Sequence, residues 1–280
     1  MAKYSDSRGK GKWKVTVVPC GYIVSPKNKL ADSGYDEDMI ISFPCQAFLL
    51  QDGTMNILID NGMNESMNAY GSNDGVNSYY ATSVQFLESL GKIGLAPEDI
   101  DLLIYTHLHA DHAGNAKYFP STKTIVQRDE WIGCLNPCHR EKMLRLYDPD
   151  TVLPLQNNPN LMLVDGDLDL MNEIRLIKTP GHTRGSQALA VNTTNGLRIF
   201  VGDQFHLPIC CFPWIDTLMN YEGIELAVTP DPDSPAMPAT LVMNYYDFYN
   251  SAEKIKALLP EEDPQYIICG HDAAVMYKGL

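Results

Sequence analysis

The sequence predicts an α/β fold in which two β-sheets face each other and helices lie on the outside. Two observations support this fold class. The chain divides into two β-rich halves, and each half ends with a helix followed by a strand. Its 280 residues contain no internal repeat and no low-complexity linker, so we expect a single domain over residues 1–280.

Alternating or continuous apolar runs predict the elements of the first half. The pair Asp52-Gly53 indicates a hairpin turn between two of its strands. Apolar residues at helical spacing predict one helix, and Gly94 follows it as a candidate C-cap. The expected strands are 14–24, 45–51, 55–60 and 100–105, and the expected helix is 80–93.

The second half repeats this order with more strands. The expected strands are 124–127, 161–164, 174–179, 188–191, 197–201 and 265–269, and the expected helices are 130–135, 141–147 and 252–259. Residues 207–249 differ, because prolines, aromatic residues and methionines are mixed without a period. We expect an irregular segment that is either a lid or substrate loop, or an insertion packed against the domain or in a homodimer interface.

Charge and composition exclude several classes of protein. A net charge of -14 disfavours nucleic acid as a partner. No apolar run is long enough to span a membrane, and Met1–Lys14 lacks the features of a secretory signal, so we expect a cytoplasmic protein without a membrane partner. The seven cysteines form no disulfide pattern and are expected mainly in the core. Cys134 and Cys138 have no second pair with which to complete a zinc site.

The residues after the strand 100–105 carry the strongest chemical signal. His107, His109, Asp111 and His112 fall within one hexapeptide, which holds three of the seven histidines of the chain. Imidazole and carboxylate are the usual ligands of zinc and similar ions. Residues two apart in an extended segment point the same way, so His107 and His109 can share one ion. Asp111 and His112 follow the turn and can face a second ion.

Three more candidate ligands follow predicted strands, and each comes directly after a glycine. They are His182, Asp203 and His271. Strand ends are where α/β folds place ligand-binding groups. Glycine lets the backbone turn tightly and approach an ion closely. The sequence therefore predicts one site built from several strand ends.

This ordered set resembles the metallo-β-lactamase-fold hydrolases over about residues 14 to 275. The resemblance implies a four-layer αββα sandwich of two mixed β-sheets. It also implies that Asp60, in the segment Asp60-Asn61-Gly62, orients a metal-bound histidine. Many relatives have Thr at the middle position of this segment, where this chain has Asn61. The implied ligands are His107, His109 and His182 for one metal, Asp111, His112 and His271 for a second, and Asp203 as a bridge.

Two divalent ions roughly 3.5–4 Å apart can share a bridging hydroxide that attacks a carbonyl polarised by one ion. Asp111 or Asp203 would then carry a proton to the leaving group. Zinc is the default metal, and iron, manganese or cobalt fit the same ligands.

Within the family, the segments around His182, Asp203 and Gly270-His271-Asp272 most resemble the lactonase branch, which includes N-acyl-homoserine lactonases. A bridging Asp argues against a true β-lactamase, and the length leaves no room for the extra domains of the di-iron oxidoreductases and nucleases. One departure concerns His206, because the homoserine lactonases carry a Tyr three residues after the bridging Asp. His206 is either a replacement donor near the oxyanion or a plain loop histidine. His139 is interpreted as a surface histidine or as one whose hydrogen bonds are satisfied.

The leading hypothesis is therefore a dinuclear-metal hydrolase that opens a small lactone or related cyclic ester. One alternative is thioester hydrolysis of the glyoxalase II type, although that branch usually adds a helical region beyond the position of His271. Another is an amide or ester hydrolase of the same fold. A third is a binding protein without activity, which would tend to have lost ligands.

Overall fold

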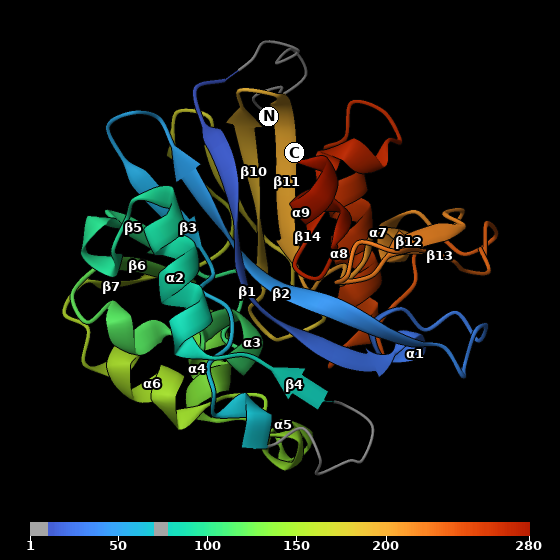
Figure 1. The fold of residues 1–280 in the computed structure, drawn as a ribbon, viewed down its shortest axis with the longest axis horizontal. Coiled ribbons are helices and arrows are strands. Elements are labelled where there is room, and N and C mark those ends of the chain that lie inside the picture. The colour runs from blue at the N-terminus through green and yellow to red at the C-terminus, as the bar shows by residue number, and fades with distance from the viewer. Residues whose placement is uncertain (1–10, 70–77) are drawn as a thin grey trace.

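The computed structural model describes residues 11–69 and 78–280, and two sheets facing each other form its centre (Figure 1). The larger sheet contains, in spatial order, β4 (Ser78–Tyr80), β1 (Lys14–Pro26), β2 (Ile40–Gln51), β3 (Asn56–Ile59), β5 (Leu102–Ile104), β6 (Lys123–Gln127) and β7 (Leu161–Val164). The smaller sheet contains β14 (Ile267–Cys269), β11 (Gly196–Gly202), β10 (Gln187–Thr193), β9 (Ile174–Lys178) and β8 (Leu168–Met171). Both combine parallel and antiparallel pairs, as predicted.

Helices cover the outer faces of both sheets (Figure 1). Beside the larger sheet lie α2 (Ser83–Ile93), α3 (Ala110–Ala113), α4 (Arg128–Leu135), α5 (His139–Leu144) and α6 (Pro149–Gln156). The remaining helices are α1 (Lys27–Leu30), α7 (Pro208–Cys211), α8 (Tyr245–Lys256) and α9 (Ala274–Lys278). Short 3-10 turns occur at Met67–Ala69, Pro97–Asp99, Ala116–Tyr118 and Pro264–Tyr266.

Three apolar layers separate these four layers of backbone. Between the sheets, the rings of Phe48 from β2 and Phe200 from β11 meet with their centroids 5.1 Å apart. Phe86 of α2 packs on the outer face of the larger sheet, and Phe248 and Ile255 of α8 pack on that of the smaller one. The predicted αββα sandwich is confirmed.

Strand direction brings the predicted ligands to one edge of the sandwich. β9 and β11 are both antiparallel to β10, and β14 is parallel to β11, so the carboxyl ends of β9, β11 and β14 point the same way. In the larger sheet β3 and β5 are parallel neighbours. Gln187 ties these two edges together, because its backbone N–H donates to the carbonyl of Thr106 at 2.9 Å and its side chain donates to that of Tyr105 at 2.8 Å.

In the first half every predicted strand and helix is present with shifted ends, and α1 and β4 are additional elements that the sequence does not predict. The β2–β3 hairpin turns at Gly53, which has a φ of 88°. The helix expected over 80–93 begins only at Ser83, because Thr82 forms a capping box with Gln85. Gly94 ends it in the left-handed conformation, as predicted.

The second half departs further from the predictions. The helix expected over 252–259 is α8, which begins earlier, at Tyr245, and ends at Lys256. It begins there because the side chain of Asn244 caps it by accepting hydrogen bonds from two backbone N–H groups. The segment 207–249 is therefore not irregular throughout. It holds α7, the hairpin of β12 (Thr217–Met219) and β13 (Glu225–Ala227), and the first turn of α8. The sequence had not indicated α6 or β8.

Within the described residues, no helix is both long and apolar enough to cross a bilayer. Residues 1–10, part of the stretch in which the sequence shows no secretory signal, lie outside the described residues. Six of the cysteines are buried, Cys134 among them, and Cys138 is exposed.

The contact between the sheets leads to a stability prediction. Phe200 is 1% exposed, so Phe200→Ala leaves a cavity between the sheets and should lower the free energy of unfolding by about 3–5 kcal/mol. Urea denaturation followed by circular dichroism measures this loss. Tyr246→Ala is the control, since Tyr246 is 77% exposed. A loss for Phe200→Ala as small as that for the control would contradict the assigned packing.

Candidate metal centre

The first group of imidazoles comprises His107, His109 and His182. One ring nitrogen from each lies within 4.8 Å of the others, and all three residues are buried. Nδ1 of His109 and Nε2 of His182 are 3.0 Å apart. Burial lowers the pKa of His109 to about 4 and lowers those of His107 and His182 well below their usual value, because it disfavours the charged ring. Neutral imidazole is the form that binds a metal ion.

The second group comprises Asp111, His112, Asp203 and His271. Burial is the largest single effect and disfavours the charged form of His112 and His271, but their contacts with Asp203, together with Asp111 and Asp60 for His112 and Cys45 for His271, outweigh it and raise both pKa values. Each ring is held from behind through Nδ1. That of His112 lies 2.9 Å from Oδ2 of Asp60, and that of His271 lies 2.8 Å from the carbonyl oxygen of Pro44. These contacts turn the two Nε2 atoms toward Asp203.

Asp203 lies between the two groups and offers one oxygen to each. Oδ2 is 3.5 Å from Nε2 of His182 and 3.9 Å from Nε2 of His107. Oδ1 is 3.0 Å from Nε2 of His112 and 3.3 Å from Nε2 of His271. Burial alone would raise the pKa of Asp203, but the surrounding imidazoles lower it well below its usual value. This placement is the one required of a carboxylate that bridges two cations.

Asp60 fixes the loop that carries the hexapeptide. Its carboxylate accepts hydrogen bonds from the backbone N–H and the hydroxyl of Thr106, both at 2.7 Å, in addition to the contact with His112. Asp60 contacts the ring of His112 as expected, and its role in orienting a metal-bound histidine stays a prediction.

Glycine is required at two of the predicted strand ends. Gly202 has a φ of 52°, and a Cβ there would lie 2.5 Å from the hydroxyl of Thr106. A Cβ on Gly270 would lie 2.9 Å from the ring of His112 and 3.1 Å from Oδ1 of Asp203. The absence of a side chain therefore lets these two strand ends approach the histidine loop.

The donor set fits divalent cations. Buried polar atoms normally have a hydrogen-bond partner. Among the described residues, one buried ring nitrogen of each of four imidazoles has none: Nε2 of His107, His109 and His112, and Nδ1 of His182. Nitrogen and carboxylate oxygen are common ligands of zinc and similar ions. The structure thus brings the seven predicted residues together, and their role as metal ligands stays a prediction.

His206 lies against the same centre. Its Nε2 is 3.1 Å from Oδ2 of Asp203, and its ring stacks on that of His271 with the centroids 5.7 Å apart. It also forms a third possible ligand group with His182 and Asp203. His206 is 5% exposed and lies beside the predicted ligands, and its role as a donor stays a prediction.

Glu130 is a buried part of the site that the sequence did not reveal. Its carboxylate accepts hydrogen bonds from the N–H of Leu108, between the first two histidines, at 2.9 Å and from that of Gly185 at 3.2 Å. It also accepts from the hydroxyls of Thr183 and Tyr147. One carboxylate therefore joins the loop of His107 and His109 to that of His182. No local pattern distinguishes Glu130 from a surface residue of a short helix.

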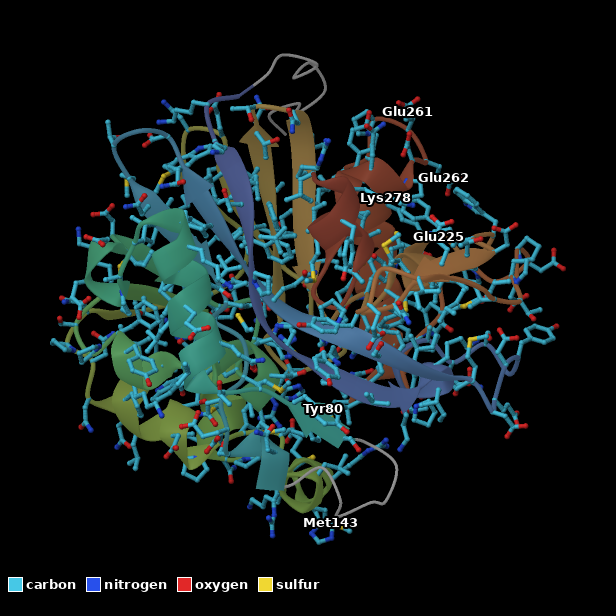
Figure 2. The ribbon with its side chains drawn as sticks, in the orientation of Figure 1. Tyr80, Met143, Glu225, Glu261, Glu262 and Lys278 are labelled. Carbon is cyan, nitrogen blue, oxygen red and sulfur yellow. The ribbon has the colours of Figure 1, made fainter. Side chains whose placement is uncertain are left out.

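A pocket of about 480 Å³ opens over the centre. Asp111, Asp203, His109, His206 and His271 reach it from below. Its walls come from β1, α1, α5 and the segment 207–249, and the exposed His139 lies at its mouth. Met143 of α5 also lines the pocket, and Figure 2 shows this side chain at the lower end of the molecule. The apolar lining residues are Ile23, Leu30, Met67, Ala110, Met143, Leu144, Leu146 and Leu241.

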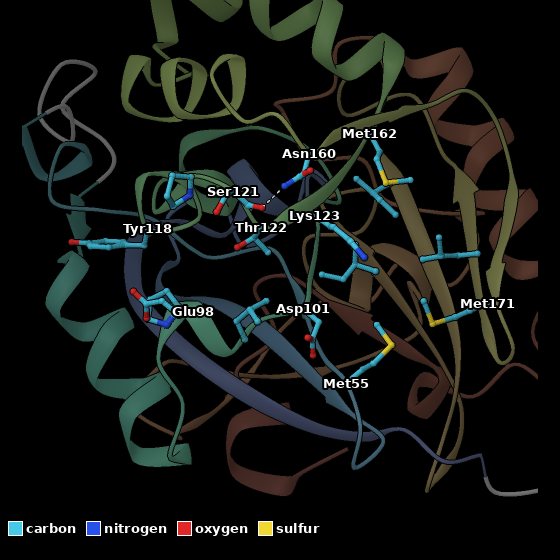
Figure 3. Close-up of a pocket in the computed structure, with 16 residues that line it drawn as sticks. Met55, Glu98, Asp101, Tyr118, Ser121, Thr122, Lys123, Asn160, Met162 and Met171 are labelled. Carbon is cyan, nitrogen blue, oxygen red and sulfur yellow. Dashed lines mark hydrogen bonds between the residues drawn. The ribbon is translucent and has the colours of Figure 1, made fainter.

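A second cavity, of about 770 Å³, lies at the beginnings of β5, β6 and β7, whereas the histidine loop follows the carboxyl end of β5 (Figure 3). Lys123, the first residue of β6, lines it beside Met55, Asp101 and Asn160. No histidine or cysteine is among its lining residues, all of which belong to the described part of the chain. The chemistry that the sequence predicts therefore belongs to the first pocket.

Comparison of this sequence with known proteins agrees with this geometry. The family model of the metallo-beta-lactamase superfamily matches residues 41–271. This chain belongs to the metallo-beta-lactamase superfamily. N-acyl homoserine lactonase AiiA from Bacillus thuringiensis subsp. kurstaki is 30% identical over 190 residues, which cover 64% of this chain and 70% of that protein. N-acyl homoserine lactonase AiiB from Agrobacterium fabrum is 34% identical over 98 residues, which cover 33% of this chain and 36% of that protein.

Solved structures share the metallo-beta-lactamase fold over almost the whole chain. An N-acyl homoserine lactone hydrolase with N-hexanoyl-L-homoserine bound at its catalytic metal center has a TM-score of 0.72 at 23% identity and covers 96% of this chain and 97% of that chain. The dizinc quorum-quenching lactonase AidC has a TM-score of 0.65 at 18% identity, covering 91% and 86%. The predicted superfamily and fold are confirmed, and the chain is a metal-dependent hydrolase.

The contacts of Glu130 lead to a prediction about metal retention. Glu130→Gln places an amide NH₂ against buried donors, so it should lower the free energy of unfolding by about 1–3 kcal/mol. It should also speed the loss of metal to a chelator, because the two histidine loops are no longer tied together. Asp148→Asn is the matched control, since Asp148 is also buried and accepts hydrogen bonds from the hydroxyl of Ser66 and the backbone N–H of Asp150, outside the two histidine loops. Equal rates of metal loss in the two variants would contradict this role.

Proposed function

We propose that this protein is a two-metal lactonase that opens a small lactone ring to the hydroxy acid. One observation carries the proposal: Asp203 offers a separate oxygen to each of two ligand groups on the floor of a pocket with an apolar wall. The names of the relatives support the substrate class, because AiiA and AiiB are both N-acyl homoserine lactonases.

In this proposal each group of ligands holds one cation. His107, His109 and His182 hold the first, Asp111, His112 and His271 hold the second, and Asp203 binds both. Two divalent cations supply polarisation of the substrate carbonyl and activation of the attacking water. We propose zinc, which suits nitrogen and oxygen ligands and is the metal in the name of the dizinc relative AidC.

The residues of the pocket floor have separate tasks during ring opening. Water adds to the carbonyl carbon, the ring C–O bond breaks, and the alkoxide that leaves takes up a proton. Asp111 is the carboxylate that carries this proton, because its side chain is 17% exposed and lines the pocket, whereas that of Asp203 is 4% exposed. His206, whose Nε2 lies 3.1 Å from Oδ2 of Asp203, shares its Nε2–H between this carboxylate and the carbonyl oxygen of the substrate as negative charge develops there.

We further propose that the segment 207–249 forms a fixed wall of the pocket and is not a free lid. Thr240 and Leu241 line the pocket. Much of the rest packs on the outer face of the smaller sheet, where Phe212, Leu218 and Met237 are buried. A segment with this many buried apolar side chains is expected to move little.

The test of the function uses protein reconstituted with Zn²⁺. The wild type should retain about two metal ions per chain and hydrolyse lactones faster than matched thioesters and linear amides. Asp203→Asn and Asp111→Asn should lower kcat/KM for lactones at least about 100-fold, since loss of a partner behind a ligand already costs about 10–100-fold. Metal analysis and a pH-indicator assay of acid release give both results.

Asp233→Asn provides the control, because Asp233 is exposed and distant in sequence from every proposed ligand. Two metal ions per chain without hydrolysis of any lactone would sink the proposed reaction. Near-normal rates in Asp203→Asn would show that this carboxylate does not join two cations.

The role of His206 is tested separately. His206→Leu should lower kcat about 100-fold with little change in KM, because it removes the proposed donor to the developing oxyanion, and such a donor acts mainly in the transition state. The metal content should stay at two per chain. A fall in metal content would instead identify His206 as a ligand, in line with its closeness to His182 and Asp203.

A further inference from the structure

The mouth of the pocket is basic, although the protein is strongly acidic. Lys29, Arg140 and Arg145 line the pocket, and its only lining carboxylates among the described residues are Asp111 and Asp203, which belong to the proposed metal centre. The whole chain has 35 acidic residues against 21 basic ones. Apart from the two carboxylates of the proposed metal centre, no acidic side chain of the described residues lines the pocket.

The exposure of the lining residues to solvent increases from the floor of the pocket to its mouth. His109, Asp203 and His271 are at most 3% exposed, and they form the floor. Lys29 is half-buried and Arg140 is exposed, so both lie nearer to solvent. Apolar side chains such as those of Ile23 and Leu30 complete the wall. A substrate therefore meets reactive groups at one end and positive charge at the other.

Thr240 holds the two cationic residues near each other. Arg140 donates from Nη2 to the carbonyl oxygen of Thr240 at 2.7 Å, and the N–H and hydroxyl of Thr240 donate to the carbonyl oxygen of Lys29 at 3.2 and 3.3 Å. Neither Lys29 nor Arg140 forms an ion pair with a carboxylate of the described residues. A guanidinium has five N–H donors, so this contact leaves most of them for a ligand.

We propose that the substrate carries an anionic substituent, a carboxylate or a phosphate, which binds Lys29 and Arg140 while the lactone ring reaches the pocket floor. This inference rests on the proposed lactonase function. Two positive charges beside an apolar wall select a molecule with an apolar body and an anionic end. A neutral lactone makes the same contacts at the floor and wall but gains nothing at the mouth.

The effect should appear in KM and depend on salt. The anionic end is remote from the reacting carbonyl, so its binding stabilises the substrate and the transition state alike. Arg140 is exposed, and ions in solution screen such contacts. For exposed ion pairs we expect a preference of about fivefold in kcat/KM over the neutral analogue at low salt.

The experiment compares γ-lactones that carry an ω-carboxylate, an ω-phosphate or the ω-methyl ester on alkyl chains of equal length. The Zn²⁺-loaded enzyme is assayed at about 0.02 M and about 0.5 M NaCl. The better of the two anionic lactones should exceed the methyl ester about fivefold at low salt, and the ratio should fall toward one at high salt. The probe that gives the larger ratio distinguishes the two anions.

Variants locate the effect. The double variant Lys29→Met/Arg140→Gln should bring the ratio at low salt to about one. Arg128→Gln/Lys278→Gln removes the same charge outside the pocket, where both residues pair with exposed carboxylates, and should keep the ratio of the wild type. Should the first double variant fail to fold, the single variants Lys29→Met and Arg140→Gln decide the question, since each should lower the ratio at low salt.

The outcomes separate the inference from the function on which it rests. Hydrolysis of all three lactones without a preference for either anion, or a preference that the Lys29/Arg140 double variant keeps, would overturn the inference and leave the lactonase function standing. Failure of the metal-loaded protein to hydrolyse any of the three would overturn the proposed function, and the inference with it.

Discussion

The buried carboxylate of Asp203, placed between two groups of imidazoles, is the constraint on which the rest of the structure depends. An ionised carboxylate is costly in a protein interior unless opposite charges or hydrogen-bond donors surround it. Imidazoles on both sides meet this requirement and keep the pKa of Asp203 low. They can do so only because β5, β9, β11 and β14 all bring their following loops to the same edge of the sandwich.

Hydrogen bonds behind the candidate ligands make this convergence rigid. Asp60 holds the start of the histidine loop through Thr106, and Gln187 ties that loop to the opposite sheet. Glu130 accepts four hydrogen bonds and joins two ligand loops from below. Satisfied polar networks of this kind fix side-chain positions more strictly than apolar packing does. Close control of ligand positions is what a two-metal hydrolase of the metallo-beta-lactamase superfamily requires.

Above this floor, the pocket combines surfaces with different chemistry. The floor supplies carboxylates and imidazoles, the wall is largely apolar, and the mouth is cationic through Lys29 and Arg140. Residues 207–249 connect these levels, since Thr240 binds the side chain of Arg140 and Leu241 belongs to the wall. In the proposed function, the reaction and the choice of substrate therefore depend on different parts of one pocket. Substitutions at the mouth can alter specificity without touching the proposed ligands.

The sequence by itself determined the fold class and the candidate ligands. Both follow from local signals: the periods of apolar residues, and a histidine-rich turn followed by glycines at later strand ends. The positioning carboxylate of Glu130, the closeness of His206 to Asp203, the start of α8 and the basic mouth were decided only by the tertiary structure. Each depends on contacts between segments far apart in the chain, and such contacts leave no spacing or composition that a linear pattern can show.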